Sequence, residues 1–484
     1  MTEPAMNWTR RSFAAGLLGA CGGFFLPAGA FGAGARTPRL RMGVLSDIHL
    51  RTGAPERTEL FRRALTHYRT RGADAVMIAG DIADSGRISE LKLCADTWYD
   101  VFPNDRTPDG RKVEKLFVYG NHCVRAWQWG KGYNDPNQPM EERKKDAIGF
   151  GENRATAWRE LFHEEYAPIW LKRVCGYAVI GAHWNDGEGG MPIEAFMKAH
   201  AAEIDPSKPF FFTQHAHPCD TCFGSWAWGH DDGRTTRALS PFPNAVAFSG
   251  HSHYTLTDER TVWQGAFTSV NTSSLFNSSL DYALRENASG NAQGYCGEKR
   301  PRRMEKLFAR RDGKQGLFMT VYDDCLVLER RDFGVSMSLG DDWVLPLSVA
   351  VEKPFAYATR RAARTAPEFP PKAEVTVAAK PGEKGGQLIA VSFPHAETHA
   401  NCRVFEYEVT ATLVEDGVDL VQAQRRVIAP DFNMPDLAAY HRSGQCVFAS
   451  EDLPLKGTYV FSVRPIECFG HKGAAIVSKT FKVS

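Results

Sequence analysis

The sequence predicts two globular parts, an α/β part followed by a smaller all-β part. In the first part, short apolar runs alternate with amphipathic stretches, which is the pattern of β-α-β units. Near the C-terminus, apolar and polar residues alternate one by one, as in half-buried strands. The length of 484 residues agrees with two domains, because one hydrophobic core rarely supports so long a chain.

The composition restricts the classes of partner. Hydrophobic residues make up 43% and charged residues 24% of the chain, and the formal net charge is +1. Such a balanced chain has no overall field to attract nucleic acid or membrane surfaces. We therefore expect no nucleic-acid partner, and we expect any anionic ligand to be held by local charges.

The first 35 residues have the composition of an export signal. Arg10 and Arg11 precede an uncharged stretch of small and apolar residues that ends in Ala-rich sequence. The order Thr-Arg-Arg-Ser-Phe at 9–13 resembles the twin-arginine signal, which directs proteins exported already folded. We expect a periplasmic or secreted bacterial protein whose mature form has no membrane span. A membrane anchor and lipoprotein anchoring at Cys21 are the alternatives.

Between the first two apolar runs, the spacing predicts a helix. Leu60, Phe61, Ala64, Leu65 and Tyr68 share one helical face, and Gly72 follows where helices commonly stop. A strand, this helix and a second strand form a β-α-β crossover.

Five apolar runs of the first part end in residue types that bind metals. These residues are Asp47 and His49, Asp81, Asn121 and His122, His215 and His217, and His251 and His253. If the backbone stays extended, residues two apart share a face, so Asp47 lies beside His49 and His251 beside His253. We expect all five clusters to gather at one sheet edge, with Asp84 as a supporting carboxylate.

This order of motifs resembles the calcineurin-like metallophosphoesterase superfamily over about residues 40 to 335. Asp-x-His, Gly-Asp, Gly-Asn-His, a His and Gly-His-x-His each follow an apolar run. The stretches QHAHPCDTCFGSW and GLFMTVYDDCLVLERRDF look like the exported bacterial branch, which often carries a C-terminal β-sandwich. The resemblance implies an α/β fold of two sheets packed as a sandwich and flanked by helices.

The resemblance also implies a dinuclear metal centre and its chemistry. It assigns one ion to Asp47, His49 and His253 and the other to Asn121, His215 and His251, with Asp81 bridging both. The mixed donors suit two divalent or trivalent ions of Mn, Fe or Zn. Phosphomonoesters or phosphodiesters would be hydrolysed by attack of a metal-bridging hydroxide.

Three further histidines are candidates with defined alternatives. The resemblance makes His122 the general acid, and the alternative is a supporting hydrogen bond to Asp47 or Asp81. Cys123 stands where the family generally has a carboxylate, which puts the orientation of His122 in doubt. His217 and His230 are candidate substrate contacts, and the alternative for each is packing.

The polar segment of residues 124–160 looks like an insertion. It carries Trp127 and Trp129, which we expect to be exposed, and it would form a lid over the substrate.

We expect four regions: a signal at 1–35, a catalytic domain at 36–360, a Pro-rich linker at 361–372 and a β-sandwich at 373–484. The sandwich is expected to be of the immunoglobulin or fibronectin type. Its inward faces are expected to carry Phe405, Tyr407, Val409, Ala411 and Leu413 in one strand and Tyr459, Phe461 and Val463 in another.

Two functions compete. The first is an exported dinuclear-metal phosphoesterase acting on a phosphoester substrate. The second is a metal-stabilised, non-catalytic binding protein that acts through the C-terminal sandwich. A nuclease is a minority alternative. We expect the sandwich to be a spacer or a binding module, whose partner is carbohydrate, protein or its own catalytic domain.

Overall fold

The structure is a computed structural model of the whole chain. It describes residues 36–484 apart from 130–137, 185–191, 223–230, 279–312, 348–352, 383–385, 398–402, 416, 430–431, 434, 436–442 and 484. All described residues belong to one compact unit, Arg36–Ser484. The expected signal at 1–35, with Cys21, and the candidate His230 lie outside the described residues.

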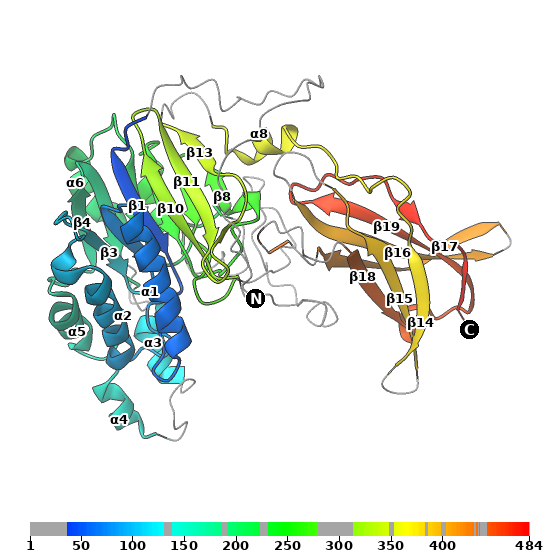
Figure 1. The fold of residues 1–484 in the computed structure, drawn as a ribbon, viewed down its shortest axis with the longest axis horizontal. Coiled ribbons are helices and arrows are strands. Elements are labelled where there is room, and N and C mark those ends of the chain that lie inside the picture. Colours follow the sequence, from blue (N-terminus) through cyan, green and yellow to red (C-terminus); the bar gives the residue numbers. More distant parts are fainter. Residues whose placement is uncertain are drawn as a thin grey trace, which may run out of the picture. The chain divides into compact units, whose positions relative to one another are not determined.

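The first sheet joins three parallel strands to a C-terminal antiparallel extension (Figure 1). β1 (Leu40–Leu45), β2 (Ala75–Ala79) and β3 (Glu114–Val118) run parallel. β10 (Gln315–Val321) pairs antiparallel with β1, and β11 (Cys325–Asp332) pairs with β10. β12 (Met337–Ser338) and β13 (Trp343–Pro346) pair with β11.

Helices of the N-terminal segment cover one face of this sheet. They are α1 (Pro55–Thr70), α2 (Ile88–Val101), α3 (Asn121–Trp129) and α5 (Asn153–Phe162), whereas the short helix α4 (Met140–Lys145) lies against α3. The expected face of α1 is confirmed, because Phe61, Ala64, Leu65 and Tyr68 are buried and Leu60 packs against the same core. The lid expectation for residues 124–160 is wrong for α5, because Trp158 and Phe162 lie in this core.

The second sheet has the order β4-β5-β6-β7-β9-β8. Its strands are β4 (Ile169–Val174), β5 (Tyr177–Ala182), β6 (Phe210–Thr213), β7 (Ala245–Ser249), β8 (Val262–Gln264) and β9 (Thr268–Asn271). Strands β5, β6, β7 and β9 run parallel, and both edge strands are antiparallel. α6 (Ile193–His200) and α7 (Arg234–Leu239) pack on its outer face.

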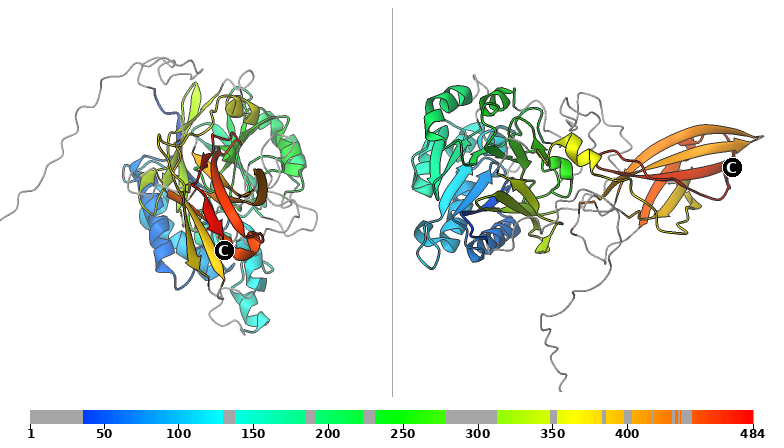
Figure 2. Two further views of the ribbon diagram at one scale, coloured as in Figure 1. Left: turned by 90° about the vertical axis from the view of Figure 1, so that its right-hand side faces the viewer. Right: turned by 90° about the horizontal axis from the view of Figure 1, so that it is seen from above.

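The two sheets pack face to face and the helices lie outside them. In β2, Val76 and Ile78 belong to the core beneath α1 and α2, whereas Ala75 and Met77 belong to the core shared with Phe211 of the second sheet. This division follows from the alternation of side chains along a strand. Figure 2 shows the blue and green helices on opposite sides of the sheets. The expected two-sheet sandwich flanked by helices is confirmed.

The C-terminal part is an antiparallel two-sheet sandwich, as expected. One sheet contains β14 (Thr376–Pro381), β15 (Gln387–Pro394) and β18 (Ser443–Ala449). The other contains β16 (Val404–Glu415), β17 (Val418–Ile428), β19 (Gly457–Glu467), β20 (Ile476–Val477) and β21 (Phe481–Val483). The inward faces predicted for β16 and β19 are confirmed, because their alternating apolar residues are buried.

The segment before the sandwich is partly helical. α8 (Tyr357–Ala362) includes the first two residues of the expected linker at 361–372. The domain boundaries remain a prediction. None of the helices that the structure describes combines the length and apolar character needed to cross a membrane.

Candidate metal centre

The candidate ligands follow strands of both sheets. Asp47 and His49 follow β1, Asp81 follows β2, and Asn121 begins α3 shortly after the end of β3. His215 follows β6 of the second sheet, and His251 and His253 follow β7. The expected gathering at one sheet edge is therefore wrong in this respect, because ligands from two packed sheets meet.

The backbone at the paired ligands is not extended. Asp47, His49, Asp81, His251 and His253 all have left-handed φ angles, of 50°, 50°, 47°, 69° and 53°. The shared-face argument from extended backbone is therefore wrong, although the side chains still converge. Hydrogen bonds between loops hold these turns: Asp47 N donates to Gly80 O at 3.1 Å, and His49 N donates to Asp81 O at 3.0 Å.

Two glycines make space for the ligands. A Cβ atom on Gly80, whose φ is 99°, would lie 2.3 Å from His215 Nδ1. A Cβ atom on Gly250 would lie 1.8 Å from Ser46 Oγ and 2.3 Å from Asp47 Oδ2. Real side chains do not approach so closely, so glycine is required where the loops cross.

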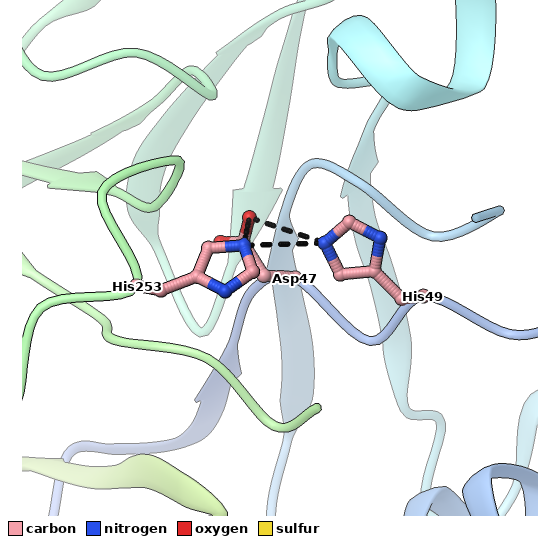
Figure 3. Close-up of side chains that lie close together, drawn as sticks. All are labelled: Asp47, His49 and His253. Carbon is pink, nitrogen blue, oxygen red and sulfur yellow. Dashed lines mark hydrogen bonds and ion pairs between the residues drawn. The ribbon is translucent and has the colours of Figure 1, made fainter. Parts of the chain in front are cut away.

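Asp47, His49 and His253 form the first group of converging atoms (Figure 3). His253 Nε2 lies 2.9 Å from Asp47 Oδ1 and 3.2 Å from His49 Nε2. His49 Nε2 lies 3.7 Å from Asp47 Oδ1. One atom of each residue can thus face a common point.

Asp81, His215 and His251 form the second group. His215 Nε2 lies 3.0 Å from Asp81 Oδ2 and 3.2 Å from His251 Nδ1. Asp81 Oδ2 also lies 3.9 Å from His49 Nε2 of the first group. The Asp81 carboxylate therefore lies between the two groups.

The second ring nitrogen of three histidines has an acceptor partner. His49 Nδ1 lies 3.0 Å from Asp84 Oδ1, His215 Nδ1 2.8 Å from Ala79 O, and His253 Nδ1 3.0 Å from Asn277 O. Because a carbonyl or carboxylate oxygen only accepts, Nδ1 donates in each pair. In the neutral ring, Nε2 then carries a lone pair that faces the centre, as metal ligation requires.

These residues fit a pair of cations. Among the described residues, Asp47 Oδ1 and Asn121 Oδ1 are buried oxygens without a hydrogen-bond donor. Burying an oxygen without a partner is costly, and a cation removes that cost. Carboxylate, amide and imidazole donors are ligands that Mn, Fe and Zn accept. The donor set fits a dinuclear centre, and it does not select one metal.

The electrostatic field of the centre favours positive charge. Burial alone would lower the pKa of His49, but the carboxylates of Asp47, Asp84 and Asp81 raise it to about 10. Burial of His215 is likewise outweighed, chiefly by Asp81 and Asp47, and its pKa rises to about 9. Burial would raise the pKa of Asp47, yet His253 and His215 hold it well below its usual range.

His122 lies next to both groups at the start of α3. Its backbone N donates to Asp81 Oδ1 at 2.8 Å, and its Nδ1 donates to Asp84 O at 2.7 Å. The supporting contact with Asp81 thus comes from the backbone, and the ring bonds a carbonyl. Cys123 is buried, and burial raises the pKa of its thiol to about 12, so this position belongs to the core.

The structure packs His217 beneath the ligand loops. Its Nδ1 lies 2.6 Å from Ser249 Oγ and its Nε2 lies 2.8 Å from Ser252 Oγ. The side chain is buried, and burial lowers its pKa to about 3. The packing alternative therefore describes its position, and it holds the loop that carries His251 and His253.

Three contacts of the centre were missed by the sequence interpretation. Asn277 orients His253, as described above. Arg57 of α1 lies 3.1 Å from Asp84 and donates to His49 O at 2.6 Å. The ring centroid of Trp184 lies 5.9 Å from that of His215 and 5.7 Å from that of His251. Only the position of Trp184, two residues after the end of β5, offered a signal. The exposure expected for Trp127 is wrong, because this side chain is buried and its Nε1 donates to Val124 O.

Comparison with known families identifies this part of the chain. Residues 40–255 match the family model of the calcineurin-like phosphoesterases. This segment is a calcineurin-like phosphoesterase domain. The match includes all seven candidate ligands of the calcineurin-like domain. No curated protein matches the sequence.

Solved structures similar to this chain include three from eukaryotes. A purple acid phosphatase from seeds of yellow lupin (Lupinus luteus) is 12% identical with a TM-score of 0.41, and the match covers 66% of this chain and 57% of that one. A dimetal phosphatase from Danio rerio is 10% identical with a TM-score of 0.35, and the match covers 64% of this chain and 100% of that one. The anchor in the inner membrane complex of Plasmodium is 10% identical with a TM-score of 0.34, and the match covers 63% of this chain and 88% of that one.

Proposed function

We propose that this protein is an exported phosphoesterase that hydrolyses phosphomonoesters or phosphodiesters at a dinuclear metal centre. One observation carries the proposal: two groups of ligand atoms converge on either side of the Asp81 carboxylate within a calcineurin-like phosphoesterase domain. Two ions held there would neutralise charge on the phosphoryl oxygens and acidify the attacking water.

The residues of the chain hold and orient these ions. Asp47, His49 and His253 would hold one ion, and Asn121, His215 and His251 would hold the other. Asp81 would contact both, which offsets the repulsion between two cations. The acceptors behind His49, His215 and His253 fix each ring in the tautomer that binds metal.

His122 would donate a proton to the leaving oxygen. Its Nδ1 donates to Asp84 O, so its Nε2 is the nitrogen able to exchange a proton with substrate. Its side chain is 31% exposed, whereas that of His49 is 3% exposed. A substrate can therefore reach His122 from solvent while its phosphoryl group faces the buried ligands.

Export and the role of the sandwich belong to the same proposal. Export is supported by the Arg10-Arg11 pair and the small-residue stretch after it. We propose a periplasmic or secreted protein whose C-terminal sandwich contacts carbohydrate or another protein.

The activity is tested with metal-loaded full-length protein. Samples loaded with Mn, Fe or Zn are assayed with p-nitrophenyl phosphate and bis(p-nitrophenyl) phosphate, and bound metal is measured in the same samples. We expect turnover of at least one ester, with the Asp81→Ala variant as the metal-depleted control. Stoichiometric metal without turnover of either ester would reject the proposal in favour of the binding protein.

A further inference from the structure

We propose that Trp129 binds an aromatic leaving group of the substrate beside His122. This inference rests on the proposed phosphoesterase function and deepens it, because it names the substrate class as phosphoesters of alcohols that carry a planar aromatic ring.

The first observation is where the centre opens to solvent. The side chains of Asp47, His49 and His215 are at most 3% exposed, and that of His253 is 20% exposed. His122 is 31% exposed, and Trp129 is 46% exposed. The exposed fraction of the side chains therefore increases from the buried ligand His49 to His122 and from His122 to Trp129.

The second observation is a continuous series of ring contacts along that path. The ring centroids of His49 and His122 lie 4.6 Å apart, and those of His122 and Trp129 lie 5.0 Å apart. The planes of His122 and Trp129 are almost perpendicular, at 87°. A leaving group that accepts a proton from His122 must extend away from the ions, and the indole is the aromatic surface next to that acid.

An exposed tryptophan alone would indicate nothing, because single apolar residues are common on protein surfaces. The contact with His122 is what distinguishes Trp129. Phe150 provides the comparison: it is 40% exposed, and its ring contacts Trp127 with centroids 5.8 Å apart. An indole offers a large, rigid face for stacking, which a planar aromatic group can use and a compact aliphatic group cannot.

The kinetic test separates stacking from acidity. Wild type, Trp129→Ala, Trp129→Phe and Phe150→Ala are compared on 1-naphthyl phosphate and on hexafluoroisopropyl phosphate, whose leaving alcohols are similarly acidic. For Trp129→Ala, we expect KM for the naphthyl ester to rise about five- to a hundredfold, the range for loss of one stacking partner. KM for the hexafluoroisopropyl ester should rise much less than KM for the naphthyl ester, because any effect through the His122 contact is common to both esters. On the naphthyl ester, Trp129→Phe should have an intermediate KM and Phe150→Ala a KM like that of wild type. Equal losses on both esters, or no change on the naphthyl ester, would overturn the proposal.

A binding measurement makes the result independent of turnover. Calorimetry of the metal-loaded proteins compares (1-naphthyl)methylphosphonate with methylphosphonate. Wild type should prefer the naphthyl compound, and Trp129→Ala should lose that preference by the same factor. If no ester is hydrolysed, the proposed function fails, but a preference that depends on Trp129 still supports the inference. Absence of the preference in wild type overturns the inference whatever the activity.

Discussion

Most of the candidate ligand residues have a backbone conformation that side chains usually avoid. Asp47, His49, Asp81, His251 and His253 have φ angles between 47° and 69°. Such a conformation costs on the order of 1 kcal/mol for a residue with a side chain. Hydrogen bonds between the loops offset that cost, as from His251 N to Asp47 Oδ2 at 2.9 Å. The ligand atoms are therefore held near one another by the loops themselves.

The position of Asp81 predicts an asymmetric pattern of metal loss. Asp81→Ala should reduce bound metal at both sites, because Asp81 Oδ2 lies 3.0 Å from His215 Nε2 of one group and 3.9 Å from His49 Nε2 of the other. His253→Ala and His251→Ala should each weaken mainly one site. Elemental analysis of the purified variants measures this. Undiminished metal in Asp81→Ala would reject the bridging role.

The position of His122 predicts loss of rate without loss of metal. His122→Ala should bind both ions nearly normally, because Asp81, His49 and the other ligands remain. The rate on alkyl phosphoesters should fall about a hundred- to ten-thousandfold, the range for a positioned acid. Nitrophenyl esters should lose less, because their leaving groups need little protonation. An equal loss on both ester types would mean that His122 acts on phosphoryl charge or site geometry instead.

At the level of elements, the crossing of the loops after β1 and β7 depends on Gly250. In Gly250→Ala the new methyl group would displace Ser46 and Asp47. We expect a loss of about 1–3 kcal/mol in the free energy of unfolding, as for overpacked sites, together with reduced metal content. Gly386→Ala is the control, because neither Gly250 nor Gly386 has a left-handed φ, and a Cβ on Gly386 would meet only Ser450 Oγ, at the ordinary contact distance of 3.9 Å. If both variants retained metal equally, the steric explanation would be wrong.

The start of α2 predicts a pH-dependent stability. Glu90 Oε2 accepts from Ser85 N at 2.8 Å and from Arg87 N at 3.3 Å. Burial, with a smaller effect of Asp84, outweighs these bonds and raises the pKa of Glu90 to about 7. The folded state therefore binds this proton more tightly than the unfolded state does. The resulting stability is full below about pH 4.3 and is lost as pH rises through about 7.

Glu90→Gln should remove this dependence while keeping an acceptor for Ser85 N. As the pH rises from about 4 to 8, the difference in the free energy of unfolding between the variant and wild type should shift by roughly 3 kcal/mol in favour of the variant. Urea unfolding at several pH values measures the difference, with Glu59→Gln on the exposed side of α1 as the control. Parallel curves for Glu90→Gln and wild type would contradict the explanation.

At the level of the whole molecule, the proposed export depends on the paired arginines. Arg10→Lys combined with Arg11→Lys should leave the precursor in the cytoplasm, because the receptor of this route reads the arginine pair. Cell fractionation followed by immunoblotting measures the distribution. Undiminished appearance of the double variant in the periplasm would show that the signal uses another route.

The sequence predicted correctly the features that depend on one segment of the chain, and it failed where contacts between segments decide. The face of α1 and the inward faces of β16 and β19 were predictable, because strict periodicity in one segment determines which residues can be buried together. The exposure of Trp127 was predicted wrongly, since its burial depends on contacts with Ala147 and Phe150, outside its own helix, that local polarity does not reveal.

The sequence by itself determined which residue types follow each strand and in what order, because strand length and strand ends are set locally by apolar runs and glycine. Only the tertiary structure decided how those residues meet. Packing of the two sheets places His215 against Asp81 and brings His251 into the same group of ligand atoms, and left-handed turns rather than extended strands direct the paired ligands. Asn277 shows the same limit, because its bond to His253 joins two loops whose approach depends on the packing of the whole domain.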